Sequence, residues 1–232
     1  MRKTILFLVF IWFANLSVAQ LHEVGISVGG SNYVGDIGPT TVIRPNAPAY
    51  GLIYKYNRNP RISYRASLTS MKMIAHNSES QNEIRQQFDV GFNKTITEFT
   101  GGIDFNFLNY EISHWKRARS VYLILELAIF HFKKAVGTAE DYTYKSQIST
   151  ALPFGVGYKT QISDRLVLGL EARIRFTFTD DIDDGQFYKD GVLKDHPENA
   201  KFNDPSTNDW YSFAGLTLTY TFGRPLSYTT RR

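Results

Sequence analysis

Histidine, serine and acidic side chains are the groups in this sequence that could support catalysis or metal binding. The five histidines are His22, His76, His114, His131 and His196. His76 and His131, with Ser78 and Ser80 nearby, would suit acyl transfer or proteolysis, in which a base activates a nucleophile. Their spacing matches no catalytic triad, so we expect a protein that is not an enzyme.

The acidic run "DDIDDG" at residues 180–185 resembles a calcium loop. Its spacing does not fit the twelve-residue calcium-binding pattern, which also needs a glutamate further along the chain. We interpret it as a solvated loop and leave cation binding by 180–184 open. The sequence has no cysteine, which excludes disulfides, thiol catalysis and cysteine metal sites. We therefore expect no metal site and no cofactor.

Four charged residues, Arg165, Glu171, Arg173 and Arg175, lie in a long segment, 165–179, in which apolar and non-apolar residues alternate almost without exception. This period of two predicts a β-strand with one apolar and one polar face. Similar alternation marks the following strands: 23–31, 48–57, 61–75, 95–108, 119–133, 150–162, 165–179 and 209–222. The strand 119–133 is apolar on both faces apart from Glu126, so its facing is ambiguous. A short helix is predicted within 79–92.

Such alternation fits either a soluble barrel with its apolar face inward or an outer-membrane barrel with that face outward. Strands of about 12–15 residues favour a membrane crossing. Glycines on the polar face would make room for charged side chains inside a narrow barrel. The charges expected to pair across the lumen are Arg65, Asp104, Glu126, Lys159, Glu171, Arg173 and Arg175. We therefore predict an all-β protein, an eight-stranded antiparallel transmembrane β-barrel.

Aromatic residues and loop lengths also favour an outer-membrane barrel. Aromatic residues near strand ends, as in interfacial girdles, are Tyr50, Tyr54, Tyr56, Phe176, Phe178, Tyr220 and Phe222. Long polar links are predicted at 32–47, 76–94, 134–149 and 180–208, and short turns at 57–60, 109–118 and 163–164. Because the strand number is even, both termini are expected on the periplasmic side, with the long loops outside.

The chain begins with a basic pair, an apolar run and small residues, which is the pattern of a secretory signal peptide. We expect a signal peptide at 1–19, a barrel at 20–223 and a periplasmic tail at 224–232. The formal net charge of +4 includes no long basic run, which argues against nucleic-acid binding.

Two stretches, "HEVGISVGGSNYVGDIG" (22–38) and "LGLEARIRFTFTDDIDD" (168–184), together with the strand count, resemble the PorG family. These are small outer-membrane barrels of the type IX secretion system of Bacteroidota. The resemblance implies a non-enzymatic scaffold that ties a periplasmic ring, formed by a lipoprotein and its soluble partner, to the outer membrane. That assembly supports protein export and, in gliding species, motility.

The periplasmic rim would then be the docking surface, with Trp115, Lys116, Arg117 and Arg119 as an aromatic and basic patch. An anchor at the membrane interface explains the same residues. Three other functions stay open: a surface-binding or adhesive barrel, a lipid-modifying membrane enzyme that uses His76 or His131, and a soluble carrier of lipophilic ligands.

Overall fold

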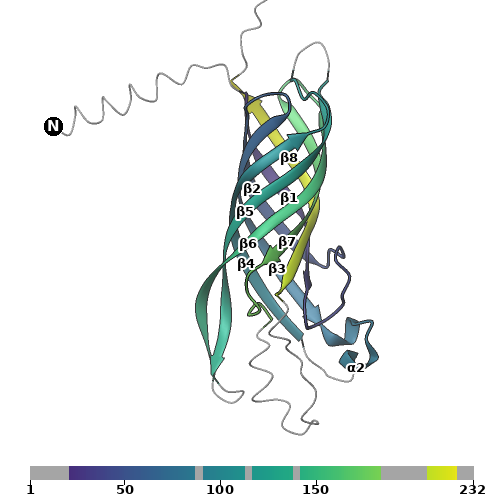
Figure 1. The fold of residues 1–232 in the computed structure, drawn as a ribbon, viewed down its shortest axis with the longest axis vertical. Coiled ribbons are helices and arrows are strands. Elements are labelled where there is room, and N and C mark those ends of the chain that lie inside the picture. Colours follow the sequence, from purple (N-terminus) through teal and green to yellow (C-terminus); the bar gives the residue numbers. More distant parts are fainter. Residues whose placement is uncertain (1–20, 87–90, 113–116, 138–141, 184–207, 224–232) are drawn as a thin grey trace, which may run out of the picture.

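The chain folds into a closed β-barrel (Figure 1). A computed structural model describes residues 21–86, 91–112, 117–137, 142–183 and 208–223. The strands are β1 (Leu21–Val34), β2 (Ala47–Asn57), β3 (Ile62–His76), β4 (Gly91–Asn106), β5 (Arg119–Gly137), β6 (Tyr142–Gln161), β7 (Leu166–Thr177) and β8 (Trp210–Phe222). The predicted eight-stranded fold class is confirmed. The predicted signal peptide and C-terminal tail lie outside the described residues.

Every strand pairs antiparallel with its sequence neighbours, and β1 pairs with β8 to close the barrel. The β1–β8 register sets His22 opposite Phe222. The first and last strands therefore start and finish at one end, which we call the terminal end. The strand ends that flank 58–61, 107–118 and 162–165 lie there too. The strand ends that flank 35–46, 77–90, 138–141 and 178–209 lie at the opposite end, which we call the loop end.

The loop end differs from the prediction at one link. Residues 134–149 were expected to be a long polar loop, but β5 runs to Gly137 and β6 starts at Tyr142, and the two strands stay paired over this whole extension. Outside a bilayer a paired hairpin needs no apolar face, so its polar sequence concealed the strands. The predicted short helix is present as a 3-10 turn, η1 (Asn77–Glu79), followed by α2 (Glu83–Gln86).

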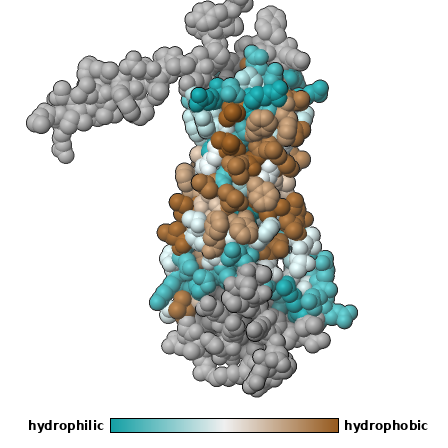
Figure 2. Space-filling view, viewed as in Figure 1, coloured by the Kyte–Doolittle hydropathy of each residue, from teal (hydrophilic) through white to brown (hydrophobic). Residues whose placement is uncertain are grey.

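The outer wall of the barrel is apolar. On β7, Leu168 and Leu170 are exposed, whereas Glu171, Arg173 and Arg175, which follow them on the alternate positions, are buried. The same arrangement recurs around the barrel and forms a hydrophobic band between two hydrophilic ends (Figure 2). An apolar belt around a charged interior, with all backbone groups paired by closure, is the arrangement of outer-membrane barrels. Among the described residues, no helix has the length and hydrophobicity to cross a bilayer.

Strand β5, whose facing the sequence left open, turns Tyr122, Glu126 and Phe130 into the lumen. Its outward residues are aliphatic, and Leu127 is 70% exposed. The ambiguity arose because the loop-end half of the lumen is itself apolar. The residues of that inner cluster include Tyr33, Met71, Met73, Ile96, Phe130, Phe132, Tyr211 and Phe213. The lumen therefore has an apolar layer at the loop end and an ionic layer nearer the terminal end.

Candidate functional site

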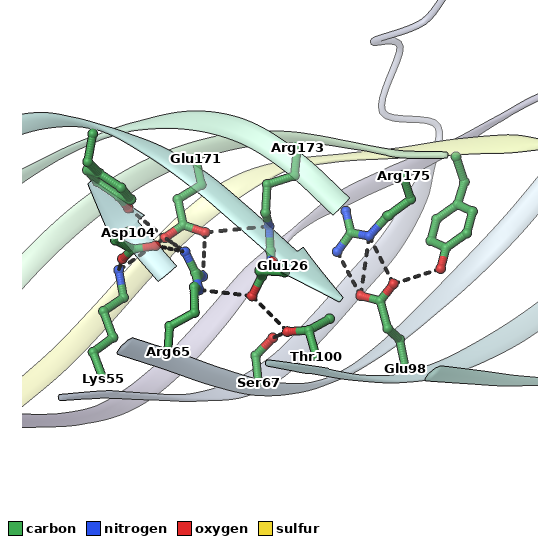
Figure 3. A network of polar contacts seen from close by, with 12 residues as sticks. Lys55, Arg65, Ser67, Glu98, Thr100, Asp104, Glu126, Glu171, Arg173 and Arg175 are labelled. Carbon is green, nitrogen blue, oxygen red and sulfur yellow. Dashed lines mark hydrogen bonds and ion pairs between the residues drawn. The ribbon is translucent and has the colours of Figure 1, made fainter. Parts of the chain in front are cut away.

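The ionic layer of the lumen is centred on Arg65 of β3 (Figure 3). Its guanidinium lies 3.1 Å from Asp104 Oδ1, 3.2 Å from Glu126 Oε1 and 2.9 Å from Glu171 Oε2. These carboxylates come from three other strands, β4, β5 and β7. Arg65 therefore connects opposite walls of the barrel through side chains alone.

Two more cations extend this cluster. Lys55 Nζ lies 2.9 Å from Asp104 Oδ2 and 3.5 Å from Glu171 Oε1. Arg173 reaches Glu126 at 3.2 Å and Glu171 at 3.5 Å. Glu171 also accepts a hydrogen bond of 2.5 Å from the Tyr122 hydroxyl. Glu171 is thus the most heavily shared acid of the cluster.

A second ion pair lies beside this cluster, towards the loop end. The Nε and Nη2 atoms of Arg175 donate to both carboxylate oxygens of Glu98, over 2.9–3.2 Å. Tyr211 donates to the same carboxylate at 2.7 Å. A bidentate pair with a third donor is one of the stronger arrangements available to buried charges.

Charges of opposite sign balance in the ionic layer of the lumen. The buried basic residues of this layer are Lys55, Arg65, Lys159, Arg173 and Arg175, and the buried acids are Glu23, Glu98, Asp104, Glu126 and Glu171. All seven residues proposed from the sequence lie in this set. Sequence reasoning missed Glu23, Lys55 and Glu98, although alternation along their strands places each on the polar face.

Lys159 differs from the other lumen cations, because its Nζ forms no hydrogen bond in the described part of the chain. The amine instead lies 3.9 Å from the ring centroid of Tyr110 and 4.9 Å from that of Tyr122. Tyr110 belongs to the 107–118 turn, and its hydroxyl donates to Glu23 Oε1 at 3.2 Å. The Tyr110 side chain therefore extends from this turn into the terminal end of the lumen, where it is buried.

Glycines create space for the buried charges, as their positions on the polar face predicted. A Cβ on Gly102 would lie 2.1 Å from the Leu125 carbonyl oxygen and 2.6 Å from the Cα of Glu126. At Gly155 it would lie 2.3 Å from the Ala172 carbonyl oxygen. The neighbouring strand comes too close to these positions for any side chain.

The histidine and serine residues considered for acyl transfer do not come together. His131 hydrogen-bonds Ser146, and Ser80 Oγ accepts a bond from the backbone N–H of Asn82. Across the described ranges, no hydrogen bond joins His76 or His131 to Ser78 or Ser80. The pairs of histidine and serine considered from the sequence are therefore not formed in the described residues.

The described part of the acidic run is engaged with protein groups. Asp181 pairs with Lys134 and accepts a 3.0 Å bond from Gln147. The Tyr33 hydroxyl lies 3.1 Å from Asp183 Oδ2 and also contacts Asp209 Oδ1. Within the described residues, no group of three metal-binding side chains is gathered. Asp184 lies outside the described residues.

Asp209, just before β8, clamps the base of the 178–209 link. Its carboxylate accepts from the Ile182 backbone N–H at 2.9 Å, and its backbone pairs with Thr177 and Thr179. Burial and the nearby Asp183 raise the pKa of Asp209 from 3.8 to about 8. The Asp209 carboxyl group therefore keeps its proton in the closed clamp up to about pH 8, whereas it loses that proton above pH ~4 when the clamp is open.

We expect this clamp to weaken as pH rises. Between pH ~4 and ~8 the closed state binds more protons than the open state, so each rise in pH favours opening, and the effect levels off above the folded pKa. Hydrogen exchange of the Ile182 amide, corrected for intrinsic rates, should show falling protection from pH 6 towards pH 8. In Asp209→Asn this pH dependence should vanish, and an unchanged dependence would contradict the assignment.

The structure describes only part of the proposed docking patch. Trp115 and Lys116 lie outside the described residues. Arg117 and Arg119 are both exposed. Arg119 opens β5 and shares the outward face with Val121, so it points to the lipid side of the wall. Arg117 belongs to the turn itself.

Comparisons with solved structures return small outer-membrane barrels. Ail of Yersinia pestis, in complex with the heparin analogue sucrose octasulfate, is 13% identical with a TM-score of 0.48, over 88% of this chain and 99% of that one. The N-terminal β-barrel domain of Pseudomonas aeruginosa OprF gives 11% and 0.44, over 88% and 98%. Neisserial surface protein A gives 10% and 0.44, over 88% and 95%.

No curated protein matches the sequence. A family model described as a domain of unknown function, DUF6089, matches residues 2–231. That match extends over nearly the whole chain, from the start of the predicted signal peptide to the end of the tail. The protein with this charge-filled barrel is therefore a member of the DUF6089 family.

Proposed function

We propose that this outer-membrane barrel is a non-enzymatic scaffold, which attaches the periplasmic ring of a type IX secretion system to the membrane. The sequence resemblance at 22–38 and 168–184 suggests this role, which would serve protein export and gliding motility. In this proposal residues 1–19 are removed as a signal peptide, and the terminal end, with the tail 224–232, faces the periplasm. The ring lipoprotein and its soluble partner would bind there.

The observation that most supports this proposal is the anchoring of the 107–118 turn. Tyr110 is buried between Glu23 and Lys159, and Tyr110 and Ala118 pack on Val167. The Ala118 amide donates to Gln161 Oε1 at 3.2 Å. This anchoring would hold the exposed Arg117 in place for a partner, which lowers the entropy lost on binding.

Charge reversal in this turn tests the docking role. We expect Lys116→Glu/Arg117→Glu to reduce recovery of the ring proteins about tenfold or more in a pull-down from solubilised membranes, because the loss of a hot-spot residue costs at least about 2 kcal/mol. The matched control is Arg44→Glu/Lys145→Glu, which reverses two exposed cations at the loop end. Heat-modifiable gel mobility would verify folding, and undiminished ring recovery would count against the proposal.

A second candidate function is surface binding by the loop end. The paired extension of β5 and β6 projects beyond the barrel wall (Figure 1) and exposes Tyr144 by 62% and Ile148 by 71%. An apolar surface beyond the membrane belt favours a binding role. If the ring proteins do not co-purify while whole cells lose a surface ligand on Tyr144→Ser/Ile148→Ser, this second function would replace the first.

A further inference from the structure

Exposed arginines lie at several points of the terminal end. Arg58 and Arg61 belong to the β2–β3 turn, Arg119 is the first residue of β5, and Arg165 belongs to the β6–β7 turn. All four are exposed, and we call them the arginine collar.

The collar lies on the edge of the apolar belt, as two of its members show. Arg165 Nη1 donates to the Tyr220 hydroxyl at 2.7 Å, with its guanidinium carbon 5.9 Å from the centre of that ring. Arg58 Nη1 donates to the Tyr64 hydroxyl at 3.3 Å. Tyr64 and Tyr220 are 42% and 40% exposed on the outer wall. Interfacial tyrosines turn their hydroxyls towards the headgroups, so these guanidinium groups lie at headgroup depth.

The other two members also lie on the lipid side. Arg61 donates to the backbone carbonyl of Phe107, an outward residue that is 48% exposed. Arg119 is on the same face of β5 as Val121 and Leu123, which are 45% and 44% exposed. The collar therefore adjoins the membrane-facing surface of the barrel.

Donor groups of the collar are in excess over acceptors. Each guanidinium has five N–H donors, and the side-chain bonds of Arg58, Arg61 and Arg165 use only one or two of them in each arginine. Among the described residues, no collar arginine lies in an ion pair with an acid. The described acids in the turns at this end are Glu111 and Asp164, and the hydrogen bond with the Tyr220 hydroxyl, with a smaller contribution from Asp164, raises the pKa of Arg165.

We propose that the collar binds the phosphate groups of anionic phospholipids in the leaflet at the terminal end. Arginine matches phosphate geometry with paired N–H donors, and a cation at an anionic membrane surface gains about 1 kcal/mol. A lipid fits better than a soluble protein, because the collar is continuous with the apolar wall on which acyl chains lie. This proposal requires the membrane barrel but not the docking of a secretion ring.

Spin-labelled lipids test this proposal on the full mature chain in phosphatidylcholine vesicles. We expect labelled phosphatidylglycerol to associate several-fold more strongly than labelled phosphatidylcholine. About 1 kcal/mol per cation corresponds to about fivefold per arginine before salt screening. In Arg58→Gln/Arg119→Gln/Arg165→Gln the preference should fall close to one.

The matched control removes three exposed cations from the loop end, in Arg44→Gln/Lys133→Gln/Lys145→Gln, and should keep the preference. Heat-modifiable mobility checks that both variants fold. Equal association of the two lipids with the unmodified protein would overturn the proposal, as would an equal loss in both variants. A collar variant that keeps its lipid preference but loses ring proteins in the pull-down would assign the collar to a protein partner instead.

Discussion

Glu171→Gln is expected to destabilise the barrel by about 3–5 kcal/mol, the cost typical of breaking a buried ion pair by removing one partner. Glu171 is fully buried and contacts Lys55, Arg65 and Arg173. Glutamine keeps the shape but removes the charge, so three buried cations share the two remaining carboxylates of the cluster. Denaturant unfolding in micelles, followed by gel mobility or tryptophan fluorescence, measures the loss.

A matched control and a compensating variant make this test specific. Glu79→Gln removes an acid from an exposed pair with Arg44, and should change stability by less than about 1 kcal/mol. Lys55→Met in the Glu171→Gln background restores charge balance and should recover part of the loss. If Glu171→Gln costs no more than Glu79→Gln, water screens the lumen charges and the network is not buried in solution.

Leu170→Lys should destabilise the barrel by about 2–4 kcal/mol in a bilayer, since that is the cost of a cation facing lipid near the midplane. Leu170 is 58% exposed, on the outer wall of β7 beside Leu216 and Tyr158. At an exposed position of a soluble protein the same change would cost within about 0.5 kcal/mol. Urea titration in lipid vesicles measures the difference between these expectations.

Thr143→Lys is the companion variant, because Thr143 is exposed on the β5–β6 extension beyond the barrel wall. It should insert and unfold like the unmodified protein. The prediction fails if Leu170→Lys is tolerated as well as Thr143→Lys, or if the mature chain stays folded and monomeric in buffer without detergent.

Alternation along the chain was sufficient to predict the strand number and which wall faces lipid. On β7 the period of two separates Leu168 and Leu170 from Glu171 and Arg173 without ambiguity, because only one face is in contact with hydrocarbon. The boundaries were less predictable where the strands leave the belt. Beyond the apolar belt both faces of a strand contact water, so the sequence need not alternate there. The extension of β5 and β6 over 134–149 was therefore predicted as a loop.

The partners within the lumen could not be predicted from the pattern. Alternation places Arg65 and Glu171 inside, but the tilt and stagger of the strands decide which charges meet across the barrel. The same limit explains why Lys159, expected to be part of the ion-pair network, instead faces aromatic rings. Its neighbour Tyr110 comes from a turn, where no period indicates which side chain points inward.

Cross-lumen pairing has a consequence for how this barrel assembles. Arg65 on β3 pairs with Glu171 on β7, and Arg175 on β7 pairs with Glu98 on β4; these strands are not neighbours, so an open sheet would leave these charges apart. A partly curled sheet that entered the hydrocarbon of the bilayer would carry unpaired side-chain charges, at a large cost in free energy. Insertion and curling should therefore occur as one concerted event, completed when β1 joins β8, with no stable intermediate of fewer strands.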